Sequence, residues 1–213
     1  MHSLPLRPTE RIAFPPVRAH RAVAPGARLR HHPLGDPDRA AVERFVDRVY
    51  AERYGASVPS WAPELVSVVA GGEIVAAAGW RPAHGPLYLE RYLDAPIERL
   101  IVDRLGRPGP PRGRIVEVGH LSAIQAGQGV RLMARLGAYL ASLGYGWVAS
   151  TATPGVRATF ERMGVEVLEL GHATAQAAGP HASAWGNYYQ RGATVVAGEL
   201  AGNLSRVAPG ALR

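Results

Sequence analysis

One carboxylate stands in the middle of an apolar run that is predicted to be a strand. Glu117 lies within Arg114–Ala123, next to Ile115, Val116 and Val118. A buried carboxylate is costly unless it has a partner or a raised pKa. A base that removes a proton from an amine needs such a setting, because its pKa must lie near the working pH. Glu117 is therefore predicted to act as a base or to orient substrate; a structural ion pair and an exposed strand edge are the alternatives.

His120 lies on the same predicted strand. Strand alternation places Glu117, Gly119 and Leu121 on one face, and Val118, His120 and Ser122 on the other. Histidine is mostly neutral near pH 7 and can carry protons in either direction. His120 is thus predicted as a proton shuttle, with a packing role as the alternative.

A second group of polar residues lies in Leu87–Glu98. Glu90, Tyr92 and Glu98 are close together there, and Arg91 lies beside them. Such a group could bind a polar acceptor, with Glu90 or Tyr92 in the chemistry. A solvated surface with alternating charges would have the same pattern.

Aromatic residues are dense in Trp185–Tyr189, where Trp185, Tyr188 and Tyr189 are nearly adjacent. Such side chains bury area while keeping a polar group, which suits a pocket wall or the entrance for an acyl chain. The C-terminal part of the core is an equal alternative.

The segment around these residues predicts a strand, a Gly-rich turn and a helix. The strand is Arg114–Ala123, the turn Ile124–Gly129 and the helix Val130–Tyr145. A turn of this kind places free amides at a helix N-terminus, where they can bind a pyrophosphate. The amides of Gln125–Val130 are the predicted donors. A strand at 146–153, a helix at 154–164 and a strand at 165–170 follow.

The composition excludes several kinds of chemistry. The 213 residues contain no cysteine and no lysine, so disulfides, thiol nucleophiles and lysine Schiff bases are ruled out. The eight histidines show no ligand spacing, which predicts no metal. The net charge of +7 suits acidic partners, although no arginine-rich arm favours nucleic acid. No apolar run is long enough to span a bilayer, and a cytoplasmic location is expected.

The remaining segments predict one domain over residues 39–200. Residues 1–38 are rich in proline and arginine and predict an extended arm with a strand at 28–32. Asp38 is placed to cap a helix over 39–54. A Gly-Gly turn joins strands 64–70 and 73–82 in a hairpin, and a helix follows at 96–105. A loop at 171–183 and a strand near 193–197 precede a tail at 201–213.

The second half of the chain resembles the acyl-CoA-binding half of GNAT-superfamily acyltransferases. Leu121-Ser122-Ala123 stands where the family has Leu-Ala-Val, and Gly127-Gln128-Gly129 where it has Gly-x-Gly. Ile124 departs from the family's basic or Gln position. The resemblance implies an α/β (α+β) fold with a central mixed, mostly antiparallel sheet and helices on both faces. It also implies that the thioester donor, acyl-CoA or acyl-pantetheine, is bound by Leu121, Ser122, Ala123, Gln125, Gly127, Gln128, Gly129, Val130 and Arg131.

The segment Phe160–Val165 is similar to the GNAT Tyr-Glu-x-x-Gly-Phe motif, whose tyrosine protonates the departing thiolate in many members. Phe160 has no hydroxyl, so that role is vacant or belongs to another residue. Tyr188 or Tyr189 is the proposed substitute.

Four sequence segments resemble segments of the thermostable hemolysin family and occur in the same order. They are YLDAPIE (92–98), VEVGHLSA (116–123), STATPGVRATFERMGV (150–165) and WGNYY…VVAGEL (185–200). The family is usually written with Asn where this chain has His120. The strand that carries Glu117 is also similar to acyl-homoserine-lactone synthases, which implies acyl carrier protein as a possible donor.

The residues and resemblances together predict an N-acyltransferase that moves an acyl group from a thioester to a small amine. Glu117, or Glu90 through water, would accept the amine proton. A degenerate GNAT fold that serves as a binding module and a membrane-active, hemolysin-like protein are the alternatives.

Overall fold

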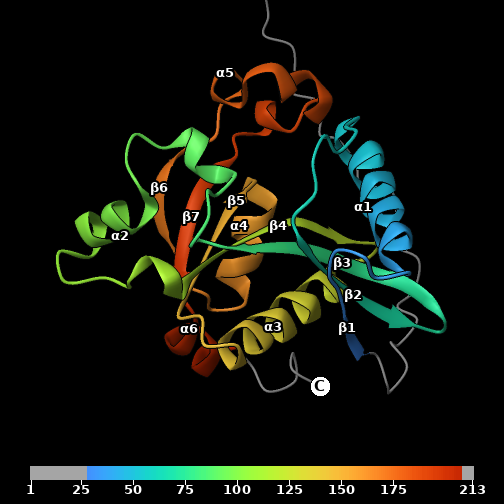
Figure 1. Cartoon of the computed structure of the whole chain (residues 1–213), viewed down its shortest axis with the longest axis horizontal. Coiled ribbons are helices and arrows are strands. Elements are labelled where there is room, and N and C mark those ends of the chain that lie inside the picture. The colour runs from blue at the N-terminus through green and yellow to red at the C-terminus, as the bar shows by residue number, and fades with distance from the viewer. Residues whose placement is uncertain (1–27, 208–213) are drawn as a thin grey trace, which may run out of the picture.

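A seven-stranded sheet runs through the whole molecule (Figure 1). The computed structural model describes residues 28–207. The strand order is β1-β2-β3-β4-β5-β7-β6. Neighbouring strands are antiparallel except for the parallel pair β4–β5. The strands are β1 (Arg28–His32), β2 (Glu64–Ala70), β3 (Glu73–Pro82), β4 (Ile115–Ala123), β5 (Trp147–Ala152), β6 (Leu168–His172) and β7 (Thr194–Glu199).

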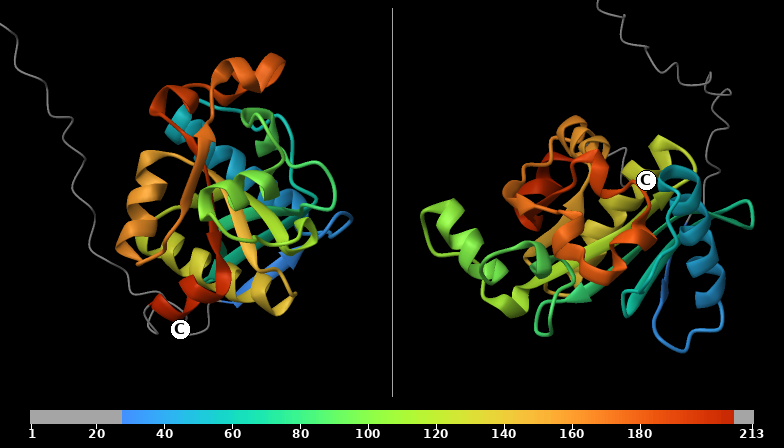
Figure 2. Two further views of the ribbon diagram at one scale, coloured as in Figure 1. Left: turned by 90° about the vertical axis from the view of Figure 1, so that its left-hand side faces the viewer. Right: turned by 90° about the horizontal axis from the view of Figure 1, so that it is seen from above.

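Helices cover both faces of this sheet, as the two further views in Figure 2 also show. The helices are α1 (Arg39–Tyr54), α2 (Ile97–Leu105), α3 (Ala126–Ser142), α4 (Pro154–Arg162), α5 (Ala175–Ala178) and α6 (Leu200–Arg206). Short 3₁₀ turns lie at Leu89–Tyr92, Arg112–Arg114, Gly179–Trp185 and Tyr189–Arg191. The predicted fold class, a mixed and mostly antiparallel sheet between helices, is confirmed.

Alternating residues of the strands divide the core between the two faces. Val116 and Val118 of β4 pack with Leu132, Leu136 and Leu140 of α3. These leucines recur at helical spacing, so one stripe of α3 is buried against the sheet. The opposite face holds α1 over β2 and β3, and the segments 83–101 over β5, β6 and β7.

Several predicted elements are confirmed. The helix over 39–54, the hairpin of β2 and β3 and the edge strand β1 lie where the sequence places them. The predicted cap at Asp38 is wrong in its chemistry, because its side chain makes no cap hydrogen bond and instead pairs with Arg30 at 3.0 Å. β1 belongs to the sheet, so residues 28–32 of the predicted arm are part of the fold. Residues 1–27 lie outside the described part.

The start of α3 differs from the prediction. The helix begins at Ala126 and not at Val130, so Gly127, Gln128 and Gly129 form its first turn. The backbone N–H of Gln125 donates to Oε1 of Gln128 at 3.1 Å. This hydrogen bond caps the helix at Gln125, one turn before the predicted start. The expected Gly-rich turn is therefore reduced to Ile124 and Gln125.

Three other boundaries are corrected near the C-terminus. β6 begins at Leu168 and not at 165, because the Asn203 side chain takes both backbone hydrogen bonds of Glu166. The N–H of Glu166 donates to Oδ1 of Asn203, and Nδ2 of Asn203 donates to the carbonyl of Glu166. The predicted loop at 171–183 contains the end of β6, helix α5 and a 3₁₀ turn. The first residues of the predicted tail form α6, which packs on α3; residues 208–213 lie outside the described part.

Across residues 28–207 no helix is long and apolar enough to cross a membrane.

Candidate functional site

The two parallel strands in the centre of the sheet separate halfway along their length. Their pairing runs from Ile115–Trp147 to Glu117–Ala149 and ends there. Beyond this point β4 continues for six residues and β5 for three, as far as Ala123 and Ala152. A cleft therefore lies between the separating strands, and Glu117 is at its apex.

A bulge interrupts β4 beside this cleft. Gly79 pairs with Gly119 and Ala77 pairs with Ser122, so two residues of β4, His120 and Leu121, oppose one residue of β3. Among the described residues other than glycine, His120 alone has a positive φ, 54°. The predicted alternation therefore fails after Gly119.

The bulge brings His120 onto the same face as Glu117. Leu121 instead packs with the core under α3. The ring of His120 stacks on Trp61 with centroids 5.2 Å apart, and Nε2 donates to the carbonyl of Ser60 at 3.0 Å. A Cβ at Gly79 would lie 2.8 Å from Nδ1 of His120, so the ring needs a glycine there.

Burial holds His120 neutral. It lowers the pKa of this imidazole to about 4, against the smaller effect of the Ser60 hydrogen bond. Nδ1 is buried and has no hydrogen-bond partner in the described chain. The structure gives little support to the predicted proton shuttle. An imidazole with a pKa of about 4 stays neutral near pH 7, and Nε2 already donates its proton to the Ser60 carbonyl.

An aromatic pocket opens on the face that carries Glu117 and His120. Its rings contact one another edge to face or tilted at centroid distances of 5.2–6.3 Å. The aromatic residues that line it are Tyr50, Tyr54, Tyr88, Tyr92, Trp185, Tyr188 and Tyr189. The aromatic segment at 185–189 is therefore a pocket wall, one of the two roles that its composition allowed.

Close backbone packing holds that segment in place. Gly186 has φ 53°, and a Cβ there would lie 2.1 Å from the carbonyl oxygen of Tyr54. The backbone N–H of Asn187 donates to the same oxygen at 2.9 Å. The aromatic segment 185–189 thus packs on the C-terminal end of α1, and only glycine fits at position 186.

Glu117 is the one carboxylate that lines the aromatic pocket. Its side chain is 9% exposed, and its Oε2 accepts from the backbone N–H of Tyr88 at 2.7 Å. Burial raises the pKa of Glu117 to about 7, even though Arg81 and the Tyr88 and Leu89 amides oppose the rise. A carboxylate with this pKa can accept a proton near neutral pH.

Arg81 faces Glu117 across the β3–β4 pair. Its Nε lies 3.6 Å from Oε2 of Glu117, longer than a hydrogen bond, and its side chain is 22% exposed. Because Arg81 also lines the pocket, the site holds a cation and a carboxylate side by side. The sequence predicts the strand that carries Arg81 but not its pairing with Glu117, because the register between β3 and β4 is set by tertiary structure.

The tyrosine hydroxyls of the pocket are already engaged. Tyr188 donates to the carbonyl of Thr151 at 3.0 Å, and burial raises the pKa of its phenol well above the ordinary value. Tyr92 and Tyr189 share a hydrogen bond of 2.7 Å, and burial raises the pKa of Tyr189 to about 12 and that of Tyr92 further. These phenols are weak acids, so their predicted role as proton donors gives way to that of wall residues.

Glu90 lies away from the pocket, against the expectation that it could act through water. Its carboxylate binds both Nη atoms of Arg112, at 2.6 and 2.8 Å, and accepts from the backbone N–H of Ile97 at 3.2 Å. The Arg112 hydrogen bonds hold the pKa of Glu90 below its usual range. Glu90 fixes the chain before α2 and is not retained in the site.

An apolar cavity of about 100 Å³ lies on the other face, beneath α3, α4 and α6. Phe160 lines it and does not line the aromatic pocket. Three residues line both spaces: Val118, Leu121 and Ser150. The two spaces therefore adjoin where β4 and β5 part.

Ser150 is the polar residue at this junction that sequence analysis missed. It is 3% exposed, and its hydroxyl is buried without a hydrogen-bond partner in the described part of the chain. An unpaired buried hydroxyl is costly, so it is a candidate to bind a ligand atom. No motif marked it, because serine in a strand is common.

An open groove leads from the junction past the N-termini of α3 and α4. Leu121, Ser122, Ala123, Gln125 and Gly129 line it, as do Arg53, Arg162 and Arg191. Gly127, Gln128, Val130 and Arg131 belong to the first turns of α3 but not to this lining.

The predicted run of free amides at Gln125–Val130 is corrected. The Gln128 and Gly129 amides already donate to the carbonyl of Gln125, and the Gln125 amide binds the Gln128 side chain. The helix end and the three arginines remain suited to phosphate. In the part of the chain that the structure describes, no group of three or more acidic or histidine side chains could hold a metal ion.

Solved structures with the same fold include acyl-homoserine lactone synthases and an N-acyl amino acid synthase. BjaI, a CoA-dependent acyl-homoserine lactone synthase with SAM and isopentyl-CoA, gives a TM-score of 0.58 at 15% identity, over 84% of this chain and 87% of its own. The acyl-homoserine lactone synthase LasI gives 0.57 at 16%, over 84% and 91%. FeeM, an N-acyl amino acid synthase from uncultured soil microbes, gives 0.53 at 14%, over 84% and 96%.

These similarities and the parted central strands define a GNAT-like fold. The model of the thermostable hemolysin family matches residues 32–204. The chain belongs to that family. No match was found among curated protein sequences.

Proposed function

We propose that this protein is an N-acyltransferase that moves an acyl group from a thioester to a small amine. One observation carries the proposal: a buried carboxylate with a pKa of about 7 lies where β4 and β5 part, between an aromatic pocket and an apolar cavity. Structures with the same fold include acyl-homoserine lactone synthases and an N-acyl amino acid synthase, which supports the same class of reaction.

The acceptor amine binds in the aromatic pocket. Glu117 is its proton acceptor, and Arg81 offers a guanidinium beside it, 3.6 Å away. A site with one cation and one carboxylate suits an acceptor with both an amine and a carboxylate, such as an amino acid. The tyrosine and tryptophan walls suit an apolar or aromatic side chain on that acceptor.

The donor lies across the junction between the strands. Its acyl chain enters the apolar cavity, whose lining is mostly apolar, and its pantetheine arm leaves through the open groove. Arg53, Arg162 and Arg191 meet the phosphates of coenzyme A, or the single phosphate of a carrier-bound arm. The amides at the start of α3 contribute less than the sequence predicts, because most of them are already bound.

The chemical step uses three groups at the junction. The amine nitrogen attacks the carbonyl carbon, and its proton passes to Glu117 as the C–N bond forms. The backbone N–H of Leu121 and the hydroxyl of Ser150 stabilise the negative charge that grows on the carbonyl oxygen. The C–S bond then breaks, the thiolate leaves, and solvent protonates it.

The absence of cysteine makes the test direct, since a thiol reagent reads only released coenzyme A. Purified protein is mixed with acetyl-CoA, medium-chain or long-chain acyl-CoA and a panel of amino acids, and thiol release and acylated product are measured. The expected result is amine-dependent release that Glu117→Gln lowers by about a hundredfold or more. Glu73→Gln, at the exposed first residue of β3, is the matched control.

The outcomes separate the alternatives. Activity with acyl carrier protein alone would assign the donor without changing the reaction. If the protein binds a thioester but transfers no acyl group to any amine tested, a binding module is favoured instead. Neither binding nor turnover, or full activity in Glu117→Gln, would overturn the proposed chemistry.

A further inference from the structure

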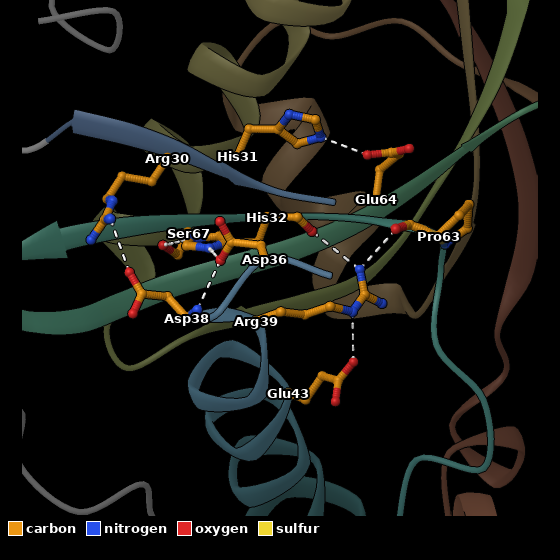
Figure 3. A network of polar contacts seen from close by, with 10 residues as sticks. All are labelled: Arg30, His31, His32, Asp36, Asp38, Arg39, Glu43, Pro63, Glu64 and Ser67. Carbon is orange, nitrogen blue, oxygen red and sulfur yellow. Dashed lines mark hydrogen bonds and ion pairs between the residues drawn. The ribbon is translucent and has the colours of Figure 1, made fainter. Parts of the chain in front are cut away.

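Arg39, the first residue of α1, is a buried arginine that joins three segments of the chain (Figure 3). Its Nε donates to Oε1 of Glu43 at 2.8 Å, and one Nη donates to the carbonyls of His32 and Pro63 at 3.1 and 2.7 Å. The other Nη donates to the carbonyl of Ala62 at 2.7 Å. Arg39 thereby ties the end of β1 and the start of α1 to the residues that precede β2.

Only arginine can make this set of contacts. Four of them diverge from one planar group, and a guanidinium has five N–H donors in a fixed arrangement. The side chain of Arg39 is 9% exposed, so the carbonyls that it binds have little access to water. Loss of the guanidinium would leave them unpaired, and the residues before β2 would lose their anchor.

Those residues carry both contacts of the His120 ring. The carbonyl of Ser60 accepts from Nε2 of His120, and the indole of Trp61 stacks on the imidazole. Ser60 and Trp61 directly precede Ala62, one of the carbonyls bound by Arg39. The position of the His120 ring therefore depends on the arginine through a segment of three residues.

His120 in turn needs outside support. Its φ of 54° is unfavourable for a residue with a Cβ, and such a conformation persists only where the surroundings impose it. It occupies the bulge of β4, whose other residue, Leu121, lines the aromatic pocket and the apolar cavity. A change in the ring position would turn the peptide groups on either side of His120.

We propose that Arg39 is a positioning residue for the site: through Ser60–Ala62 it fixes the ring of His120, and through His120 the backbone of the β4 bulge. Its kinetic consequence rests on the proposed function, whereas its structural consequence does not. The salt bridges nearby in the same network, such as Arg30–Asp38, make no contact with Ser60–Ala62 and supply a control.

The test compares Arg39→Met and Arg39→Lys with Arg30→Met by NMR titration of the His120 imidazole. The His120→Asn spectrum assigns the signal. Wild type and Arg30→Met are expected to titrate near pH 4, because burial lowers that pKa, with smaller contributions from the charges of Arg81 and Arg39. Arg39→Met removes one of these charges together with the anchor and is expected to move the midpoint up by at least one pH unit. Arg39→Lys keeps the charge but lacks the planar guanidinium, so a smaller rise in this variant reports the position of the ring.

Trp61→Leu removes the stacking contact of the His120 ring directly and so tests the same link without changing Arg39. It should raise the His120 midpoint as Arg39→Met does, and the double variant should show less than the sum of the two effects, because both act through one contact. In the acyl-transfer assay Arg39→Met should lower kcat at least tenfold, with a smaller change in the acceptor KM. Arg30→Met should leave both unchanged.

An unchanged His120 titration in Arg39→Lys or Arg39→Met, with cooperative unfolding retained, would overturn the proposal. If Arg39→Met does not fold, Arg39→Lys and Trp61→Leu decide it alone. If no donor and acceptor support turnover, the proposed function fails, and the titration still tests the positioning of His120. A shifted titration with unchanged kcat would overturn the link from His120 to the bulge.

Discussion

Glu117 and Ala149 form the last pair that joins β4 to β5. On one side of this pair the strands share a regular parallel ladder, and on the other they separate around the junction of two cavities. The carboxylate therefore lies where the pairing of β4 with β5 ends, buried by the strands yet next to open space. This position explains how one group is both desolvated and accessible to a substrate.

The first prediction concerns the pH dependence of acyl transfer. Because burial raises the pKa of Glu117 to about 7, its basic form becomes more abundant as pH rises through 7. The kcat/KM for the acceptor is expected to rise with a midpoint near pH 7 and then to level off until other groups titrate. Initial rates from pH 5 to 9 would measure it. A rate already constant from pH 5 upward would exclude Glu117 as the base.

The second prediction concerns stability and needs no substrate. The folded-state pKa of Glu117, about 7, lies above its ordinary 4.5, so the native state holds the proton more tightly than the unfolded chain does. The Glu117 contribution is therefore present below pH 4.5 and is lost as pH rises through 7. Glu117→Gln is expected to unfold like wild type at pH 4 and to be more stable at pH 8, by about 3 kcal/mol at most.

Urea denaturation at both pH values would measure that difference, because all other groups titrate alike in the two proteins. A variant that is less stable than wild type at pH 8 would show that Glu117 is held mainly by its ion pair with Arg81.

Local sequence patterns predict most of the elements but not the site. The helix over 39–54 and the hairpin of β2 and β3 follow from periodicity and a Gly-Gly turn, which are local signals. The bulge at His120 reverses the face of every later residue in β4, and nothing in the local pattern marks it. Its causes, the contacts with Ser60 and Trp61, are distant in the sequence.

Glu90 also shows that residue type and local sequence do not identify a site residue. Its type and its neighbours were compatible with catalysis, and only the tertiary contact with Arg112 shows that the carboxylate is used to hold the chain. Glu117 was correctly placed as a buried carboxylate, because an acidic residue in an apolar strand carries an energetic cost that the sequence already displays.

The third prediction concerns Ser150. Removal of a buried hydroxyl that has no partner eliminates a desolvation cost, so Ser150→Ala is expected to be as stable as wild type or more stable, by about 1 kcal/mol. The same change is expected to lower kcat by about tenfold to a hundredfold, because the hydroxyl stabilises charge that appears in the transition state. Thermal denaturation and steady-state rates would measure both. A variant with unchanged kcat would remove Ser150 from the chemistry.

The fourth prediction concerns the choice of acceptor. Arg81→Met is expected to raise KM for amino acids by about tenfold, the value of one charge-assisted contact, and to have little effect with the matching amino-acid amides. Arg99→Met, an exposed arginine on α2, is the control. Equal losses with both kinds of acceptor would show that Arg81 acts on Glu117 and not on a substrate carboxylate.

The last prediction concerns the acyl chain. Leu204 of α6 lines the apolar cavity, so Leu204→Ala enlarges the space proposed for the chain. Each further buried methylene contributes about 0.8 kcal/mol, so the preference for longer donors should rise about fourfold per carbon until the new space is filled. The cavity itself should cost about 2 kcal/mol of stability, at the lower end for leucine, because Leu204 is only partly buried. Leu143→Ala, at a leucine that is 48% exposed, should change neither quantity. Competition between acyl-CoA chain lengths would measure the preference, and a uniform loss across all lengths would place the acyl chain elsewhere.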